Sequence, residues 1–294
     1  MPVSLSLSAK MMNAEMACSE KRCLLIVGMH RSGTSMLAHL MVKLGYDIGK
    51  NRLRPGPGNP SGFFENKPIM IFNDKLLRSM NTTWRDSCHI EPELLRSRIS
   101  DVISSELVSI LEDQFSGQAR CLVKDPRMCR LMPFWTAILG TIGIKKIRCL
   151  LPIRHPMNVA RSLQARDKFT VPRGLLLWIQ NVLAAERDTR EHVRMVTIYD
   201  DVLSGISVSA LAGFLEVSES LLMASIKQVA NPVLCHQFNL DSNQSDLSDI
   251  EELALRIWVS LSGSAYSDAL DEEALDAFWQ DYLRVHKSWE ARSI

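Results

Sequence analysis

The sequence predicts an α/β fold, a single domain in which a parallel sheet is flanked by helices. Short apolar runs rich in Val, Ile and Leu recur along the chain, and each is followed by a helical pattern. That alternation favours parallel strands with helices on both faces. At 294 residues the chain is long enough to bury a core of its own. The runs expected to form strands are Cys23–Val27, Cys121–Val123, Ile147–Ile153 and Met195–Tyr199.

The first strand leads through a tight turn into a helix. Apolar residues repeat at helical spacing from Met36 to Leu44, and Gly45 then offers a stop. The segment Arg54–Gly62 holds so many Gly and Pro residues that we expect a surface loop, suited to act as a lid or as an acceptor loop. Right-handed crossovers would place the carboxyl end of every strand on one rim of the sheet.

The second half of the chain is expected to be mostly helical. Helical patterns cover Leu175–Glu186, Ile250–Leu261 and Glu272–Val285, and the Ser- and Asp-rich segment Asp241–Asp249 indicates an exposed loop. Residues 1–20 have no basic start and no unbroken apolar stretch, so they resemble neither a signal peptide nor a transit peptide, and we expect a disordered tail followed by one domain over 21–294.

The composition argues against several classes of partner. Lys plus Arg (34) nearly equals Asp plus Glu (33), so no global field draws the chain to nucleic acid or to anionic lipid. Seven cysteines without a CxxC pair fit neither a disulfide framework nor a zinc site. The most apolar window, Gly174–Ala185, is interrupted by Gln180 and Asn181. We therefore expect a cytoplasmic protein with no nucleic-acid partner, no membrane span and no metal ligands.

A phosphate-binding loop is expected between the first strand and its helix. The residues are Gly28-Met-His-Arg-Ser-Gly33-Thr34-Ser35, placed where backbone N–H groups and the positive end of a helix can surround an anion. Their spacing follows the Walker A pattern, but Thr34 replaces the lysine that acts on β- and γ-phosphates. A nucleotide without β- and γ-phosphates needs no such lysine, and Arg31 is placed to supply positive charge. The other interpretation is a plain strand–helix turn. The expected donor contacts here are His30, Arg31, Ser32, Gly33, Thr34 and Ser35.

A second phosphate site is expected after the third strand. Arg154 follows that strand directly, and Pro156 suits the first turn of a new helix. Asn158, Ser162 and Arg166 then share one helical face. An arginine at the carboxyl edge of a strand beside such a polar stripe can hold phosphate, although a solvated helix start with a salt bridge fits the same residues. Two separate sites imply a nucleotide that is phosphorylated at two places.

Together the two motifs resemble those of the sulfotransferase superfamily. Gly28–Ser35 is similar to its 5′-phosphosulfate loop, and Arg154 with Ser162 is similar to its 3′-phosphate motif. The likeness extends from Cys23 to Asp201 and is strongest to bacterial and tyrosylprotein sulfotransferases. It implies a P-loop nucleoside-triphosphatase-like fold and 3′-phosphoadenylyl sulfate (PAPS) as co-substrate, with no metal required. It also implies transfer of a sulfuryl group to a hydroxyl of a small molecule or, by likeness to that branch, of a saccharide or glycan.

Two further residues are candidates for the transfer step. Lys124, in Lys124-Asp125-Pro126-Arg127, resembles the lysine of a motif in the tyrosylprotein branch, which implies contact with the sulfuryl oxygens or the bridging oxygen. The alternative is a surface pair with Asp125 in which Asp125 caps a helix. Arg127 fits either a sulfate contact or a structural role. Glu65 resembles the glutamate that removes the acceptor proton in the glycan and tyrosylprotein branches. The other interpretation of Glu65 is a carboxylate at a helix start. The expected catalytic set is thus Glu65, Lys124 and Arg31.

Other features of the sequence are less informative. His30, His89 and His155 are more often structural than catalytic, and the tryptophans Trp84, Trp135 and Trp178 are most simply core or cleft lining. No residue could be assigned to an adenine pocket. A phosphate-loop kinase is the second hypothesis, opposed by Thr34 in place of lysine. A nucleotide-binding scaffold that keeps both phosphate motifs without catalysis is the third.

Overall fold

The computed structural model describes residues 22–56, 59, 62–99, 101–141, 144, 146–229, 248–267 and 269–292. The expected disordered tail 1–20 lies outside these residues, as do 241–247 of the expected Ser- and Asp-rich loop and part of the Arg54–Gly62 segment. The end of that Ser- and Asp-rich segment is already helical, because Ser248 caps a helix that begins at Asp249.

Four parallel strands form one sheet, as the sequence predicts. They are β1 (Arg22–Ile26), β2 (Arg120–Lys124), β3 (Lys146–Ile153) and β4 (Val193–Ile198), in the order β2-β1-β3-β4. In β1 and β2 every residue after the first is buried, as expected for strands covered on both faces. The expected end of β4 is corrected by one residue, since Tyr199 begins the next helix.

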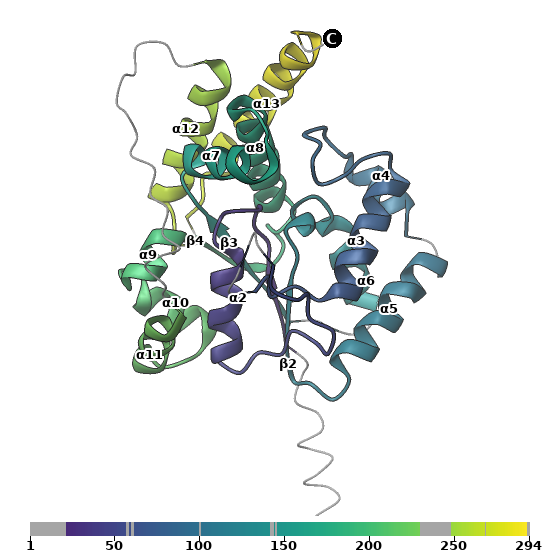
Figure 1. Ribbon diagram of the computed structural model, residues 1–294, viewed down its shortest axis with the longest axis vertical. Helices are drawn as coiled ribbons and strands as arrows, with labels where there is room; N and C mark the ends of the chain where they lie inside the picture. Colours follow the sequence, from purple (N-terminus) through teal and green to yellow (C-terminus); the bar gives the residue numbers. More distant parts are fainter. Residues whose placement is uncertain are drawn as a thin grey trace, which may run out of the picture.

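Helices cover both faces of this sheet. Alternate residues of β1 point to opposite sides, so Leu25 packs in the larger apolar cluster and Leu24 in the smaller one. The smaller cluster is completed by α2 (Thr34–Lys43), α9 (Tyr199–Ser204), α10 (Val208–Leu215) and α11 (Glu219–Val229). The larger is completed by α3 (Lys67–Ser79), α4 (Pro92–Ser97), α5 (Asp101–Phe115), the short helix η1 (Pro126–Arg130), α6 (Met132–Thr141), α7 (Pro156–Asp167), α8 (Val171–Arg187), α12 (Asp249–Gly263) and α13 (Glu272–Arg292). Accordingly, α9 to α11 and α3 to α6 lie on opposite sides of the molecule (Figure 1).

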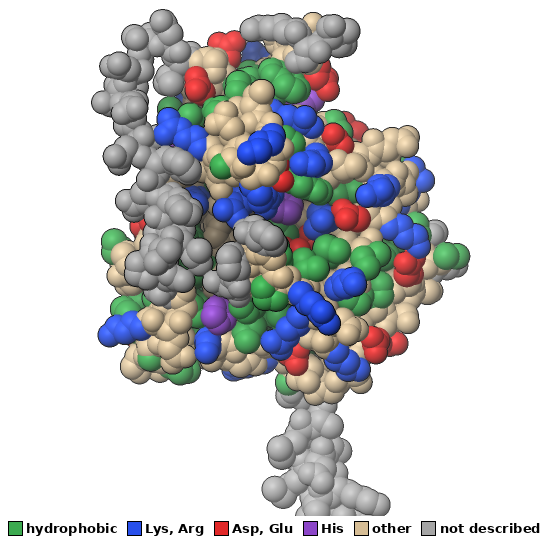
Figure 2. Space-filling model, in the orientation of Figure 1, with side chains coloured by type: hydrophobic (Ala, Val, Ile, Leu, Met, Phe, Trp, Pro, Cys, Tyr) green, Lys and Arg blue, Asp and Glu red, His purple; other side chains and the backbone are tan. Residues whose placement is uncertain are grey.

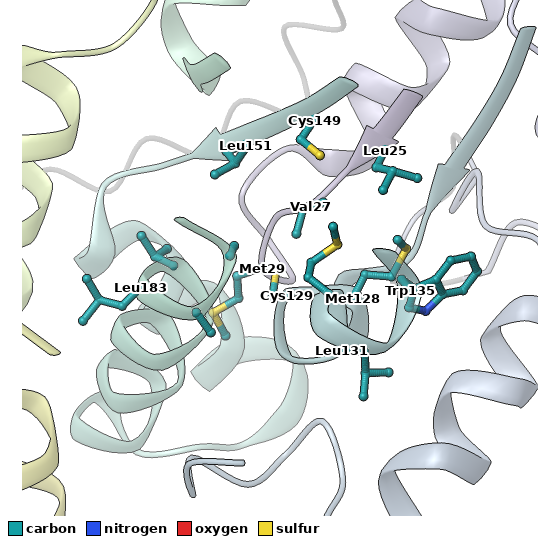
Figure 3. Close-up of a cluster of buried hydrophobic side chains, with 14 of the residues drawn as sticks. Leu25, Val27, Met29, Met128, Cys129, Leu131, Trp135, Cys149, Leu151 and Leu183 are labelled. Carbon is teal, nitrogen blue, oxygen red and sulfur yellow. The ribbon is translucent and has the colours of Figure 1, made fainter. Parts of the chain in front are cut away.

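The larger cluster holds two of the tryptophans expected in the core. Trp135 and Trp178 are fully buried, and Trp135 faces the sheet together with sulfur-containing side chains of η1 (Figure 3). Such close packing fixes η1 against β1 and β3. Because η1 directly follows β2, the end of that strand and its Lys124 are fixed as well.

Three helices between β1 and β2 were not expected from the sequence. The helices α3, α4 and α5 occupy 67–115, a span in which we predicted no element. Their signal is present, since α3 buries Ile69, Phe72, Leu76 and Leu77 at helical spacing. Elsewhere the expected helices form, although α8 starts earlier, at Val171, because the Thr170 side chain caps it.

The strand order opens a crevice between β1 and β3. The chain leaves β1 for β2 on one side and leaves β3 for β4 on the other, so the connections diverge at the carboxyl ends of the two central strands. In open α/β sheets this divergence is the usual place for a ligand. Both expected phosphate motifs follow these two strands.

Among the described residues no single helix has the length and apolar composition to cross a membrane, and α10 with α11 reach that composition only as a pair bent by 108°.

Candidate anion-binding and transfer site

The loop after β1 is held in a conformation that requires glycine at two places. Gly33 has a φ of +86°, and a Cβ there would lie 2.1 Å from Cδ2 of Tyr199. A Cβ on Gly28 would lie 2.6 Å from Cγ of Pro152. Real side chains do not tolerate such distances, so these glycines let the loop lie against the ends of β3 and β4. Among the described residues no side chain caps α2, and the buried Thr34 begins it. The start of that helix therefore faces the crevice with its positive end.

The two expected phosphate motifs meet in space. Arg31 Nε donates a hydrogen bond to Ser162 Oγ at 2.7 Å, although the residues are 131 positions apart in the chain. Arg154 is buried, its guanidinium lies 4.9 Å from the Tyr199 ring centre, and its carbonyl accepts from Trp178 Nε1 at 3.1 Å. The pKa of Arg31 is lowered by its burial and then by the charges of Arg166 and Arg154. Cations are thus crowded where an anion is expected.

Several polar atoms of the two phosphate motifs are buried without a protein partner. Ser32 Oγ, His30 Nε2 and Asn158 Oδ1 have no hydrogen-bond partner among the described residues. Buried polar atoms are usually satisfied, so each such atom calls for an explanation. A polar ligand bound by the two motifs would supply partners for them. The donor set present, guanidinium, hydroxyl and imidazole groups, suits phosphate or sulfate oxygens.

His30 is a neutral group among cations. Its pKa lies well below the ordinary value because of burial first, and then because of the charges on Arg127, Arg166, Lys124 and Arg31. The neutral imidazole can donate one hydrogen bond without adding another positive charge to this crowded site.

Lys124 and Glu65 form a buried ion pair beside the loop. Lys124 Nζ donates to Glu65 Oε1 at 2.6 Å, to the carbonyl oxygen of Phe63 at 3.1 Å and to Ser35 Oγ at 3.4 Å. The exposed fractions of the two side chains are only 2% and 7%. Ser35 also donates to Phe63 O at 3.1 Å, which joins this pair to the start of α2. The alternative expectation of a surface pair between Lys124 and Asp125 is therefore wrong, although Asp125 does cap a helix, η1, as that alternative expected.

The backbone around Glu65 is fixed from several directions. Its carbonyl oxygen accepts from Leu53 N at 2.7 Å. The next residue, Asn66, caps α3 by accepting from Ile69 N, and its amide donates to Gln114 Oε1 at 2.7 Å. Glu65 lies directly before this cap, so it stands at the start of α3, as the alternative interpretation expected. The same packing places its carboxylate against Lys124 at the end of β2.

Arg127 has a structural role, one of the two left open by the sequence. Its guanidinium pairs with Asp74 at 2.6 Å and with Asp125 at 2.9 Å. Burial opposes its charge, but Asp125 and Asp74 together raise its pKa above the ordinary value. Asp125 also caps η1 and accepts from Asn73. These bonds hold the turn after β2 and so fix the position of Lys124.

The sequence did not predict a group of residues beside His30. The Trp84 ring lies 4.4 Å from the His30 ring, and the Arg166 guanidinium lies 5.7 Å from Trp84 while pairing with Asp167 at 2.7 Å. Lys and Arg side chains gather on this face below α7 and α8, with a histidine among them (Figure 2). The local signal in the sequence was Arg85 directly after Trp84 in a loop, and this pair of residue types is too common to indicate a site.

His89 and the buried Cys149 have other surroundings. His89 pairs with Glu91 at 3.3 Å, and the pKa of the Cys149 thiol is raised by burial to about 12. Cys23, Cys88, Cys129 and Cys149 form no disulfide bonds. Among the described residues no three His, Cys, Asp or Glu side chains come together to hold a metal ion.

Comparison with known proteins gives only distant likenesses. No family model and no curated protein matches the chain. The sulfotransferase domain of the Synechococcus PCC 7002 olefin synthase is similar with 14% identity and a TM-score of 0.41, over 92% of this chain and 94% of that one. The sulfotransferase STF1 of Mycobacterium tuberculosis is similar with 13% identity and a TM-score of 0.39, over 77% of this chain and 76% of that one. Likenesses this weak leave the activity to be argued from the site.

Proposed function

We propose that this chain is a sulfotransferase that moves a sulfuryl group from PAPS to a hydroxyl of a small molecule or glycan. The observation that carries the proposal is the hydrogen bond between Arg31 and Ser162, which brings the loop after β1 and the helix after β3 to one crevice. A nucleotide with a 5′-phosphosulfate and a 3′-phosphate would place one anion at each motif. The residues proposed to bind it are His30, Arg31, Ser32, Gly33, Thr34, Ser35, Arg154 and Ser162.

Charge supports a doubly anionic ligand over a neutral one. Burial lowers the pKa of Arg31, and the charges of Arg166 and Arg154 lower it further. A phosphate or sulfate between them would replace this repulsion by charge-assisted hydrogen bonds, which are among the strongest in proteins. The buried Ser32 hydroxyl supplies a further donor.

The transfer step we propose is an in-line displacement. The acceptor oxygen forms a bond to sulfur, the bond from sulfur to the bridging oxygen breaks, and the hydroxyl proton passes to Glu65. Lys124 and the N–H groups at the start of α2 stabilise the charge that develops on the sulfuryl and leaving oxygens. The longest bond of Lys124 goes to Ser35 at 3.4 Å. This bond is the easiest for Lys124 to exchange for a sulfuryl oxygen.

Calorimetry with adenosine 3′,5′-bisphosphate, the desulfated donor, tests the binding half of the proposal. We expect binding without added magnesium, and binding at least tenfold weaker in Arg154→Gln. Arg148→Gln is the matched control, because Arg148 lies on β3, the strand that Arg154 directly follows, but pairs with Glu216. Adenosine 5′-monophosphate, which lacks the 3′-phosphate, should bind more weakly.

Radiolabelled PAPS with a panel of hydroxyl compounds tests the reaction. Transfer of label to any acceptor supports a sulfotransferase. Bisphosphate binding without transfer to any acceptor would favour the scaffold hypothesis. Tight binding of ATP with magnesium and none of the bisphosphate would favour the kinase and overturn the proposal.

A further inference from the structure

A layered group of arginine and aromatic side chains borders the transfer site. The Arg85 guanidinium lies 5.1 Å from the Trp84 ring centre and 4.9 Å from that of Phe169. Arg166 lies 5.7 Å from the Trp84 ring, and Arg173 lies 4.6 Å from that of Phe169. We call these five residues the arginine–aromatic cluster. They come from the loop after α3, the end of α7 and the start of α8, so only the fold brings them together.

The charges of this cluster are not balanced by its contacts. Among the described residues one carboxylate, that of Asp167, pairs with it, at 2.7 Å from Arg166 and 3.6 Å from Arg85. Arg173 donates to the carbonyl oxygen of Arg85 at 3.1 Å. Three cations therefore share one anion. Stacking on aromatic rings favours arginine but neutralises none of its charge.

The cluster is not needed to hold the loop on which Trp84 lies. Arg130 already donates from its guanidinium to the carbonyl oxygens of Thr83, Asp86 and Cys88 and to the hydroxyl of Thr82. A single buried arginine thus secures both ends of that loop. Arg85 and Arg166 are therefore not required to hold this loop. The exposed fractions of their side chains are 44% and 26%, which leaves both available to a ligand.

The position of the cluster separates it from Arg154 of the proposed 3′-phosphate site. Arg154 precedes α7 and Arg166 lies near its end, so about 18 Å of helix axis separates the two residues. Trp84 contacts His30 of the phosphate loop at 4.4 Å between ring centres. The cluster therefore borders the crevice beside the phosphate loop, far along α7 from Arg154 and one helical turn beyond Ser162.

We propose that the acceptor is itself an anion, whose carboxylate, sulfate or phosphate group binds Arg85 and Arg166 while its ring packs on Trp84. The planar fork of a guanidinium matches two oxygens of such a group, and an indole offers a flat apolar surface to a sugar or aromatic ring. The inference rests on the proposed sulfotransferase function and names its substrate class. It assigns Arg166, expected from the sequence to bind the donor, to the acceptor instead.

Matched ligand pairs test this inference by binding, so it does not depend on finding the natural acceptor. The protein is saturated with adenosine 3′,5′-bisphosphate and titrated with p-nitrophenyl β-glucoside or its glucuronide, and with N-acetylglucosamine or its 6-sulfate. We expect the charged member of each pair to bind at least tenfold more tightly, and we expect this preference to shrink as salt is raised from 50 to 500 mM.

Variants test whether the arginine–aromatic cluster causes the tighter binding of the charged ligands. Arg85→Gln and Arg166→Gln should each weaken binding of the charged ligands about tenfold, a loss of roughly 1.4 kcal/mol. Binding of the neutral ligands should stay unchanged in both variants, and binding of the bisphosphate should stay unchanged in Arg85→Gln. Lys168→Gln is the control, because it removes an exposed cation beside Asp167 that lies outside the cluster. Equal binding within both pairs, no measurable binding of either charged ligand, or full retention of the preference in both variants would overturn the inference. Failure of the wild-type protein to bind the bisphosphate would instead reject the proposed function.

Discussion

The buried pair of Lys124 and Glu65 makes a measurable prediction for stability. Lys124→Met removes the cation and leaves the Glu65 carboxylate at a site where its side chain is only 7% exposed. Removing one partner of a buried ion pair typically costs about 3–5 kcal/mol. For large domains each kcal/mol lowers the melting temperature by about 2–4 °C, so we expect a fall of roughly 6–20 °C. Urea unfolding followed by circular dichroism measures the free energy directly.

A double-mutant cycle separates the pair from its surroundings. Glu65→Gln should also destabilise the protein, because it leaves the ammonium group buried. The double variant carries neither charge. Its loss in free energy of unfolding should therefore be about 1–3 kcal/mol smaller than the sum of the losses in the two single variants. The exposed pair of Lys75 and Glu106 has the same 2.6 Å separation and serves as the control. The corresponding variants there should cost about 0–1 kcal/mol.

The same variants test the chemistry. The double variant should still bind adenosine 3′,5′-bisphosphate but should transfer no label from PAPS, because both the proton acceptor and the cation at the sulfuryl group are gone. Additive single losses would show that the two side chains do not pair in solution. Normal turnover in a folded double variant would remove both residues from the mechanism.

Three further predictions concern the phosphate loop. Gly33→Ala should lower bisphosphate affinity at least tenfold and reduce the melting temperature, because a Cβ would lie 2.1 Å from the Tyr199 ring at a φ of +86°; an unchanged calorimetric titration would contradict this. Arg31→Lys keeps the charge but loses the Nε donor to Ser162, so we expect about tenfold weaker binding, with Ser162→Ala giving a similar loss by calorimetry. Because the pKa of His30 is lowered in the folded protein, the unfolded chain binds more protons than the folded one below about pH 6.5. Lowering the pH below this value should therefore reduce the free energy of unfolding, by up to about 1.4 kcal/mol per pH unit for this group. His30→Gln should flatten that decline between pH 6.5 and 5, as measured by urea unfolding, and an unaltered pH profile would argue against it.

The sequence predicts those features that local patterns encode. Strand β1, the loop from Gly28 and helix α2 follow from an apolar run, spaced glycines and a helical repeat, all within one short segment. Arg154 and Pro156 likewise mark the end of β3 and the start of α7 by their positions alone. The order of the strands then brings both motifs together, which is why two separate local signals predict one crevice.

Contacts between distant segments leave no such signal. Glu65 and Lys124 are 59 positions apart, and Arg127 and Asp74 are 53 apart, so no spacing rule links them. Sequence reasoning therefore left open whether Arg127 contacts sulfate or supports the fold, and only the structure shows its ion pairs with Asp74 and Asp125. Trp84 was expected to be core or cleft lining, and its contacts with His30 and Arg166 depend on a loop whose path Arg130 fixes.

The placement of positive charge explains how the phosphate loop dispenses with its lysine. A Walker A lysine carries its charge on the loop itself, whereas here Thr34 takes that position and the cations come from other elements. Arg31 approaches from the loop, Arg154 from the end of β3 and Lys124 from the end of β2. Each contacts a protein partner, a hydroxyl, an aromatic ring or a carboxylate, that holds it in place. Charges fixed in this way on three neighbouring strands need little rearrangement when a ligand arrives, and such preorganisation is how electrostatic stabilisation lowers a barrier.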